Sequence, residues 1–167
     1  MKNLQDLINN RRSIYNFTDA LVDDKILNQA LFAASNAPCH KHTHPWRFYI
    51  LGSDSRTKLI PTIRRLAKIK SEKMGSIKIA ADAQRAIKKI TQPPLLIAVT
   101  SQRSPNDELR AREDYAATVC ALHNLVLSLW ENGVGSQWST GSITRDKSTY
   151  EILSIDYIKE EIYENTT

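Results

Sequence analysis

One short segment of this chain gathers most of its histidines beside a cysteine. His40, His42 and His44 are three of the four histidines, and Cys39 directly precedes them. Imidazole and thiolate groups are common zinc ligands, so the segment is a candidate metal site. It runs without a break into residues 46–51, which are aromatic and β-branched. The segment is therefore also a candidate loop that lies over a ligand and leads into a buried strand.

The metal interpretation is the weaker of the two. Pro38 and Pro45 bracket the histidines, which argues against the regular strand that would place their rings on one face. The sequence has no second Cys/His group and no carboxylate pair at ligand spacing, and the fourth histidine, His123, falls in a long predicted helix. We therefore predict that the chain has no metal site.

Two other groups of residues have the chemistry to bind a polar or anionic ligand. The triplet Arg11-Arg12-Ser13 follows a short predicted helix, and two guanidinium groups beside a hydroxyl form a good anion clamp. Residues 133–141 follow a long apolar helix and place Trp138, Ser139 and Thr140 between glycines. Each group is weak evidence alone, because most Arg-Arg-Ser triplets lie on the surface.

Hydrophobic spacing predicts the elements that must position these groups. Helices are expected over 3–10, from Asp23 or Asp24 to Pro38, around 59–67, over 71–91 with a break at Gly75, over 108–132, and from Thr144 to 153. Strands are expected over 46–51 and 95–99, a strand-like run over 134–141, and a polar loop over 101–107. After Leu153 we predict a short helix or a frayed end rather than a strand. This helix-rich order indicates a single α+β domain over 1–167.

The charge of the chain is unevenly distributed. Its formal net charge is +5, but residues 56–89 hold eleven Lys or Arg against Glu72 and Asp82, a local charge of +9. Such a segment can hold phosphate backbones. It has no interleaved aromatic residues and no recognisable nucleic-acid module. We therefore expect a solvated helix face or a mobile lid, and no nucleic-acid partner.

The cellular location is predicted from two absences in the sequence. The N-terminus has no uninterrupted apolar stretch of the kind found in secretory signals, and no run is long enough to span a bilayer. Cys39 and Cys120 lie far apart, which is typical of free thiols in a reducing compartment. We therefore expect a cytoplasmic protein without a membrane partner.

Taken together, the three groups resemble the nitroreductase family of FMN-dependent oxidoreductases. Arg-Arg-Ser stands near the N-terminus, Ala-Pro-x-His-Lys-x-x-x-Pro-Trp-Arg-Phe begins at Ala37, and Gly-x-Gly-x-x-Trp-x-x-Gly begins at Gly133 after a long apolar helix. The resemblance runs from about Leu4 to Thr149 and is strongest to the short, single-domain bacterial members. Three motifs in this order are far more specific than any one of them.

The resemblance implies a fold, a cofactor and a site. The fold is an α+β nitroreductase-like fold with a small, mainly antiparallel sheet flanked by helices, and a long central helix at the interface of a homodimer. FMN would lie at that interface, and the dimer core would include Tyr115, Val119, Leu122 and Leu129. The cofactor-binding residues would be Arg11, Arg12 and Ser13 at the phosphate and ribityl–pyrimidine side, Asn36 and His40 from the loop after the second helix, His44 at the flavin ring edge, and Trp138, Ser139 and Thr140 from the Gly-rich segment.

The implied activity is the transfer of hydride from NAD(P)H, through the flavin, to a nitroaromatic, a quinone or a related small-molecule acceptor by a ping-pong mechanism. Because flavin N5 carries the chemistry, no catalytic side chain is expected.

The sequence also departs from the family pattern. Tyr15 replaces a frequent arginine, Cys39 an Asp or Ser, and His44 an amide, while residues 154–167 form an acidic, divergent or truncated end without Gly or Pro. The alternative hypothesis is therefore a divergent relative with weak or lost FMN binding, acting as a flavin-binding or interaction module.

Overall fold

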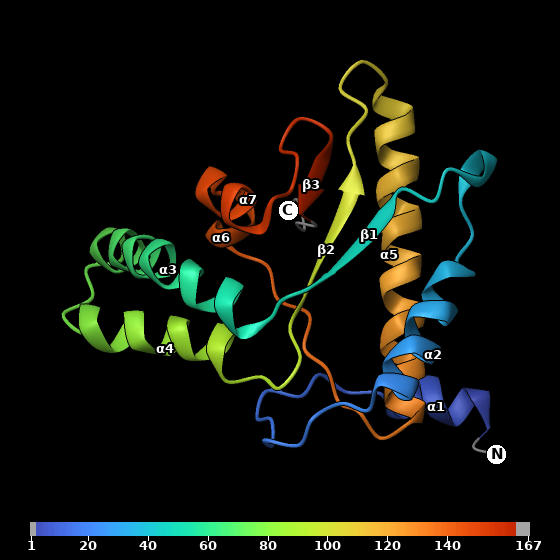
Figure 1. Cartoon of the computed structure of the whole chain (residues 1–167), viewed down its shortest axis with the longest axis horizontal. Coiled ribbons are helices and arrows are strands. Elements are labelled where there is room, and N and C mark those ends of the chain that lie inside the picture. Colours follow the sequence, from blue (N-terminus) through green and yellow to red (C-terminus); the bar gives the residue numbers. More distant parts are fainter. Residues whose placement is uncertain (1–2, 163–167) are drawn as a thin grey trace.

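A computed structural model describes residues 3–162 of the chain (Figure 1). The elements are α1 (Leu4–Asn10), α2 (Asp24–Ser35), the 3-10 turn η1 (His40–His42), β1 (Trp46–Ile50), α3 (Ser53–Lys73), α4 (Ile79–Thr91), β2 (Ile97–Gln102), α5 (Glu108–Glu131), α6 (Ser142–Arg145), α7 (Lys147–Leu153) and β3 (Glu160–Ile162). Within residues 3–162, no helix combines the length and apolar character that crossing a bilayer requires.

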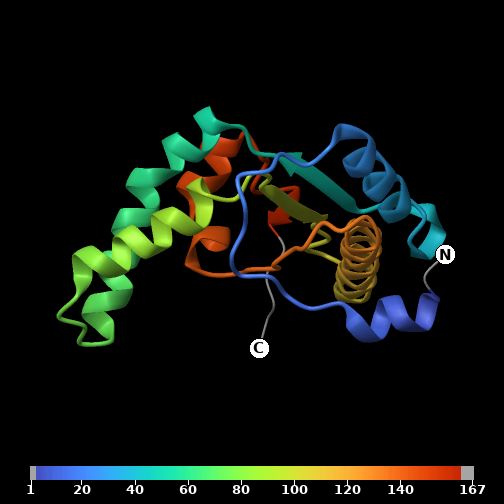
Figure 2. The same cartoon turned by 90° about the horizontal axis from the view of Figure 1, so that it is seen from below.

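The three strands form one antiparallel sheet in the order β1-β2-β3. Side chains alternate between its two faces, as strand geometry requires. Phe48 and Val99 pack with Leu122 of α5, whereas Tyr49 and Ala98 pack against α3, α4 and α7. Figures 1 and 2 show helices on both sides of the sheet, with α2 and α5 on one side and α3, α4, α6 and α7 on the other. The predicted α+β class and small antiparallel sheet are confirmed.

Helix α5 packs against α2 through small side chains. Ala30 and Ala34 of α2 and Ala121 of α5 are all 0% exposed, and Leu125 and Leu129 extend the same cluster. Small residues let two helix axes approach closely, which fixes α2 firmly on α5. The loop that follows α2 is therefore carried by the longest helix of the chain.

The buried face of α5 differs in part from the expectation. Leu122 and Leu129, which the resemblance placed in a dimer core, are buried within this chain itself. Tyr115 and Val119 are only partly buried here, against the Val99 side of the sheet. Dimer contacts by α5 would therefore involve the partly exposed residues rather than these two leucines.

The prediction of a helix or frayed end after Leu153 is wrong for residues 160–162, which form β3. The carboxylate of Glu160 accepts hydrogen bonds from the hydroxyls of Tyr49 at 2.8 Å and Thr100 at 2.6 Å. Ile162 is buried, and its amide donates to the Tyr150 hydroxyl at 2.9 Å. Neighbouring hydroxyls thus accommodate the acidic residue that made a strand look unfavourable. The remainder of the predicted divergent end, residues 163–167, lies outside the described residues.

Three other boundaries differ from the sequence prediction. The run 134–141 forms no regular strand and makes only one isolated bridge, between Ser13 and Ser136. The single helix expected from Thr144 is two helices, because Asp146 has an extended backbone and its carboxylate caps α7 through the amide of Ser148. β2 begins at Ile97 rather than at residue 95 and extends to Gln102, since its last residues pair with β3.

Tyr49 is expected to make the protein less stable at high pH. Burial and the hydrogen bond to Glu160 raise the pKa of Tyr49 to about 12, above the value of about 10 in an unfolded chain. The unfolded chain therefore loses this proton first, so the stabilising contribution is complete below pH ~10 and is lost as the pH rises toward the folded pKa. Urea unfolding at a series of pH values should show a smaller decline for Tyr49→Phe than for the unaltered protein. Tyr15→Phe, which removes an exposed tyrosine, should keep the full decline; equal declines in all three proteins would contradict the assignment.

Candidate functional site

The Gly-rich segment that follows α5 lies beside the N-terminal triplet. Ser13 and Ser136 form a parallel bridge, and the amide of Ile14 donates to the carbonyl of Ser136 at 3.0 Å. Gly135 permits this approach, because a Cβ placed on it would lie 2.5 Å from Cγ1 of Ile14. The structure thus brings two of the three predicted groups together, although residues 14 and 136 are far apart in the sequence.

The Gly-rich segment and Ile14, which directly follows the triplet, line a cavity of about 720 Å³, whereas Arg11, Arg12 and Ser13 are not among its lining residues. Trp138, Ser139 and Thr140 line it on one side, and α5 and the sheet form an apolar wall that includes Leu122 and Val99. Trp138 is 46% exposed. Within residues 3–162, the hydroxyls of Ser139 and Thr140 are exposed and make no hydrogen bond. The Gly-rich segment therefore offers one aromatic ring and two hydroxyl groups to a ligand.

The two arginines of the triplet have different roles in the structure. Arg12 donates its Nη1 to the carbonyls of Asn9 at 2.7 Å and Arg11 at 2.8 Å, so it closes the C-terminal end of α1. Arg11 is half-buried and is in no salt bridge with a described residue. Because a guanidinium group has five N–H donors, Arg11 retains its full capacity for an anion and Arg12 retains part of its own.

The loop that carries the histidines is a tight turn with an unusual backbone. Lys41, His42 and His44 have φ angles of 51°, 53° and 43°, in the left-handed region that non-glycine residues rarely occupy. Nδ1 of His44 lies 3.8 Å from Sγ of Cys39. The His44 ring also meets Trp46 edge to face, with 5.3 Å between ring centroids. The turn thus presents an exposed His44 that neighbours hold from two sides.

A buried carboxylate on α5 anchors this turn. Asp114 is 1% exposed, and its Oδ1 accepts a hydrogen bond from the Thr43 hydroxyl at 2.9 Å while its Oδ2 accepts one from Nε of Arg110 at 2.8 Å. His40 adds a weaker link, with Nδ1 3.8 Å from Oε1 of Glu113. Sequence reasoning missed Asp114. The sequence signal that could have identified Asp114 is the position of an acidic residue on the buried face of α5, one turn before Thr118.

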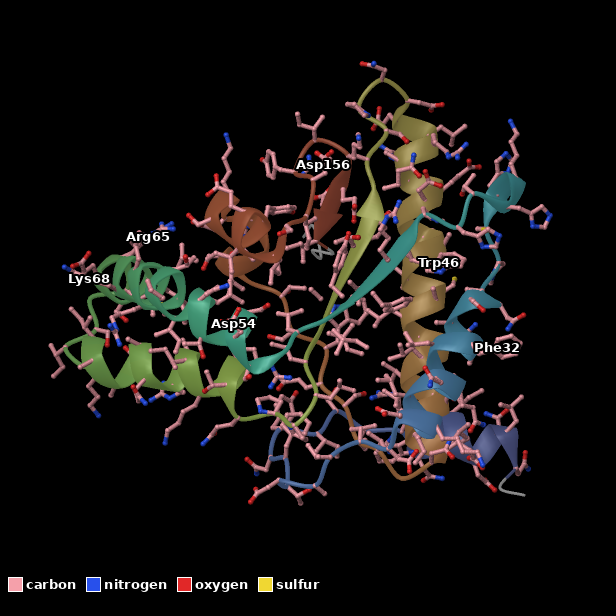
Figure 3. The ribbon with its side chains drawn as sticks, viewed as in Figure 1. Phe32, Trp46, Asp54, Arg65, Lys68 and Asp156 are labelled. Carbon is pink, nitrogen blue, oxygen red and sulfur yellow. The ribbon has the colours of Figure 1, made fainter. Side chains whose placement is uncertain are left out.

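Within one chain the predicted cofactor residues fall into two sets. Glu113, beside the histidine turn, and Asn132, at the start of the Gly-rich segment, are separated by most of α5, a distance of about 28 Å at 1.5 Å per residue. Figure 3 shows Phe32 and Trp46 at different heights along this helix. Asn36, His40 and His44 form one set. His40 lies beside the N-terminal part of α5, and Asn36, at the end of α2, lies beside its middle, because the neighbouring Ala37 packs with Ala121 and Leu125. Arg11, Arg12, Ser13, Trp138, Ser139 and Thr140 form the set near its C-terminal end.

The side-chain amide of Asn36 forms a hydrogen bond with the last turn of its own helix, α2. Its Nδ2 donates to the carbonyl of Phe32 at 2.7 Å, and the side chain is exposed.

Among residues 3–162, no three His, Cys, Asp or Glu side chains converge in a way that would hold a metal ion. Cys39 and Cys120 are free thiols.

An α+β fold with these three motifs in this order defines a nitroreductase-like protein. A sequence model of the Nitroreductase family matches residues 8–163, and the chain therefore belongs to this family. It is 31% identical over 153 residues to the Bacillus subtilis protein named "Putative NAD(P)H nitroreductase YfhC", which covers 91% of this chain and 76% of that protein.

Solved structures show the same fold. The crystal structure of a nitroreductase-like family protein from Bacillus cereus superposes with a TM-score of 0.78 at 24% identity, over 100% of this chain and 91% of that one. A nitroreductase with bound FMN from Bacteroides fragilis superposes with a TM-score of 0.71 at 19% identity, over 98% and 85% of the two chains. Together, the family match and these superpositions establish the nitroreductase fold for this chain.

Proposed function

We propose that the protein is an FMN-dependent NAD(P)H oxidoreductase that reduces nitroaromatic, quinone or related small-molecule acceptors by a ping-pong mechanism. The observation that carries this proposal is the bridge between Ser13 and Ser136. It brings Arg11-Arg12-Ser13 next to a segment whose aromatic ring and two hydroxyl residues line an apolar cavity, as Ile14 also does.

The chemistry of these residues fits FMN. Arg11, with Arg12 and Ser13, would hold the phosphate and the ribityl–pyrimidine side through charged hydrogen bonds. Ser139 and Thr140 would bind the polar groups of the cofactor, and Trp138 would contact its ring system. When bound, FMN would supply the transfer of two electrons from NAD(P)H to the acceptor. The apolar wall of the cavity would exclude water from the side that receives these two substrates.

A homodimer with FMN at its interface would unite the two sets of residues. The histidine turn and the Gly-rich segment lie at opposite ends of α5, too far apart to contact one ring system within one chain. A two-fold axis would bring Asn36, His40 and His44 of the second chain to the first set, as in any isologous interface. An exposed apolar side chain on this side of the molecule supports such an interface, since Phe32 of α2 is 71% exposed.

The absorption spectrum of the freshly purified protein tests the proposal. Flavin absorption bands, release of free FMN on denaturation, and NAD(P)H oxidation with a nitroaromatic or a quinone are expected. Double-reciprocal plots at several acceptor concentrations should be parallel, as a ping-pong mechanism requires. A colourless protein that also fails to take up added FMN would overturn the proposal. FMN binding without turnover would favour the second candidate, a flavin-binding or interaction module.

Replacing Arg11 with glutamine should weaken FMN binding by roughly tenfold to a hundredfold, the value of one charged hydrogen bond. The measurement is titration of the apoprotein with FMN, followed by quenching of flavin fluorescence. Arg85→Gln removes an exposed cation from α4, far from the triplet, and should leave the affinity unchanged. If both variants lost affinity equally, the effect would reflect net charge rather than a contact with the phosphate.

A further inference from the structure

The helical hairpin formed by α3 and α4 carries eleven of the 23 Lys and Arg residues of the chain. Figures 1 and 2 show that it projects from the sheet, and that its turn, residues 74–78, lies at the end of the molecule opposite α5. Residues 56–89 have a local charge of +9. The cavity is lined by Leu59 and by Lys89 at the base of the hairpin, but by no residue between them. The turn is therefore not positioned to cover the cavity.

The end of this hairpin exposes apolar side chains to solvent. Ile77 is 95% exposed, Met74 is 73% exposed and Ile69, one turn of α3 before the end, is 52% exposed. Gly75 has a φ of 64° and lets the chain reverse between the helices. Three large apolar residues this close to a projecting turn form a patch that a solvated helix face does not explain.

Lysines surround this patch. Lys70 and Lys73 lie in the last turn of α3, and Lys78 precedes α4. Among the described residues, neither Lys70 nor Lys73 is in a salt bridge. Farther back on α3, Arg65 pairs with Asp146 at 2.8 Å and Lys68 faces Glu72 at 3.8 Å, and both cations are labelled in Figure 3. Three lysines without a salt bridge among the described residues, Lys70, Lys73 and Lys78, therefore lie at the turn beside the apolar patch.

We propose that this hairpin turn docks on an anionic lipid surface. Met74 and Ile77 enter the boundary between head groups and acyl chains, and Lys70, Lys73 and Lys78 contact lipid phosphates. Long lysine side chains suit this role, because their apolar stems follow buried surface while the ammonium groups stay in water. The contact is peripheral, which agrees with the lack of a bilayer-crossing helix among residues 3–162.

Two other occupants fit the surface less well. A stable protein interface buries on the order of 1,000 Å² or more, and three apolar side chains at a narrow turn do not provide such an area. Single-stranded nucleic acid is held by aromatic side chains that stack on bases, and residues 69–78 contain none. Charge complementarity together with an apolar tip favours a membrane surface. The proposal thus departs from the sequence prediction of a solvated face or mobile lid without a membrane partner, and it is independent of the flavin chemistry.

Cosedimentation of the full chain, as purified, with lipid vesicles tests the proposal. The protein should bind vesicles that contain phosphatidylglycerol and not vesicles of phosphatidylcholine alone, and added salt should weaken the binding. The double variant Lys70→Gln/Lys73→Gln and the double variant Met74→Ser/Ile77→Ser should each reduce the affinity at least roughly tenfold. Lys25→Gln/Lys88→Gln removes the same charge away from the turn and serves as the matched control.

Three results would overturn the proposal. The first is equal binding to both kinds of vesicle. The second is an equal loss in the control and the lysine variant, which would indicate net charge alone. The third is salt-sensitive binding to DNA or RNA without binding to lipid. Thermal unfolding of each variant verifies that it folds. If the Met74→Ser/Ile77→Ser protein does not fold, the vesicle binding of the lysine variant alone tests the proposal. NAD(P)H oxidation without lipid should be unchanged in the lysine variant, which separates this test from that of the proposed function.

Discussion

Replacing Asp114 with alanine is expected to lower the free energy of unfolding by about 3 kcal/mol. The carboxylate is 1% exposed and accepts hydrogen bonds from Thr43 and Arg110. Its removal leaves the guanidinium group of Arg110, which is 29% exposed, without its partner in a largely buried position. Urea unfolding monitored by circular dichroism measures the loss.

The same helix supplies a matched control. Glu108 and Arg112 also form an i,i+4 pair on α5, but their side chains are 79% and 76% exposed. Glu108→Ala should therefore cost less than about 1 kcal/mol. If the two substitutions cost the same, burial would not be the reason for the effect of Asp114.

Asp114→Ala should also weaken FMN binding through the turn that it anchors. Thr43 lies between His42 and His44, so loss of its hydrogen bond frees a backbone with three left-handed residues. Thr43→Val tests this route separately, because it removes the hydroxyl and leaves Asp114 with Arg110. A Thr43→Val protein that is stable but binds FMN weakly would identify Thr43 as a positioning residue. Unchanged affinity in both variants would contradict this role.

Replacing Gly135 with alanine is expected to separate the two segments that form the candidate site. The added Cβ would lie 2.5 Å from Cγ1 and 3.1 Å from Cβ of Ile14. These distances are too short for the segments around Gly135 and Ile14 both to remain in place. Such overpacking costs about 1 to 3 kcal/mol. The bridge between Ser13 and Ser136 should open, so FMN affinity should fall together with stability.

Gly52→Ala is the control for this substitution. A Cβ at Gly52 would meet nothing within 4 Å, and its φ of −71° suits alanine. It should change stability and FMN affinity little. Ile14→Ala in the Gly135→Ala background should recover part of the lost affinity, since it removes the atoms that the new Cβ contacts. No recovery would show that the steric explanation is wrong.

Much of the fold could be predicted because local signals agreed with the tertiary structure. Asp23 caps α2 as expected, Gly133 ends α5 with a φ of 76°, and Gly75 separates the two basic helices. These residues act on their own neighbours. The apolar spacing of α2 matches its buried face, and that of α5 matches in part, through Leu122 and Leu129. Such features depend on a few consecutive residues and can therefore be read from a single sequence.

The features that sequence reasoning missed depend on partners distant in the chain. Glu160 joins a strand because Tyr49 and Thr100 supply hydroxyl donors. No residue near Glu160 in the sequence predicts these two partners. Asp114 is compatible with a buried helix face because Arg110, one turn earlier, and Thr43, distant in the chain, both donate to it. For the candidate site, the motifs supplied the predicted residues, whereas their separation into two sets became visible only from the length of α5.

The length of α5 has a genetic consequence. In a homodimer of the proposed geometry, each of two active sites contains one set of residues from each chain. A chain defective at His44 and a chain defective at Arg11 would then be able to complement each other. Coexpression of the two inactive chains should yield mixed dimers in which one site collects both defects and the other is intact. Such dimers would regain activity that neither parent possesses, and the helix would thus allow two damaged copies of one gene to produce a working enzyme.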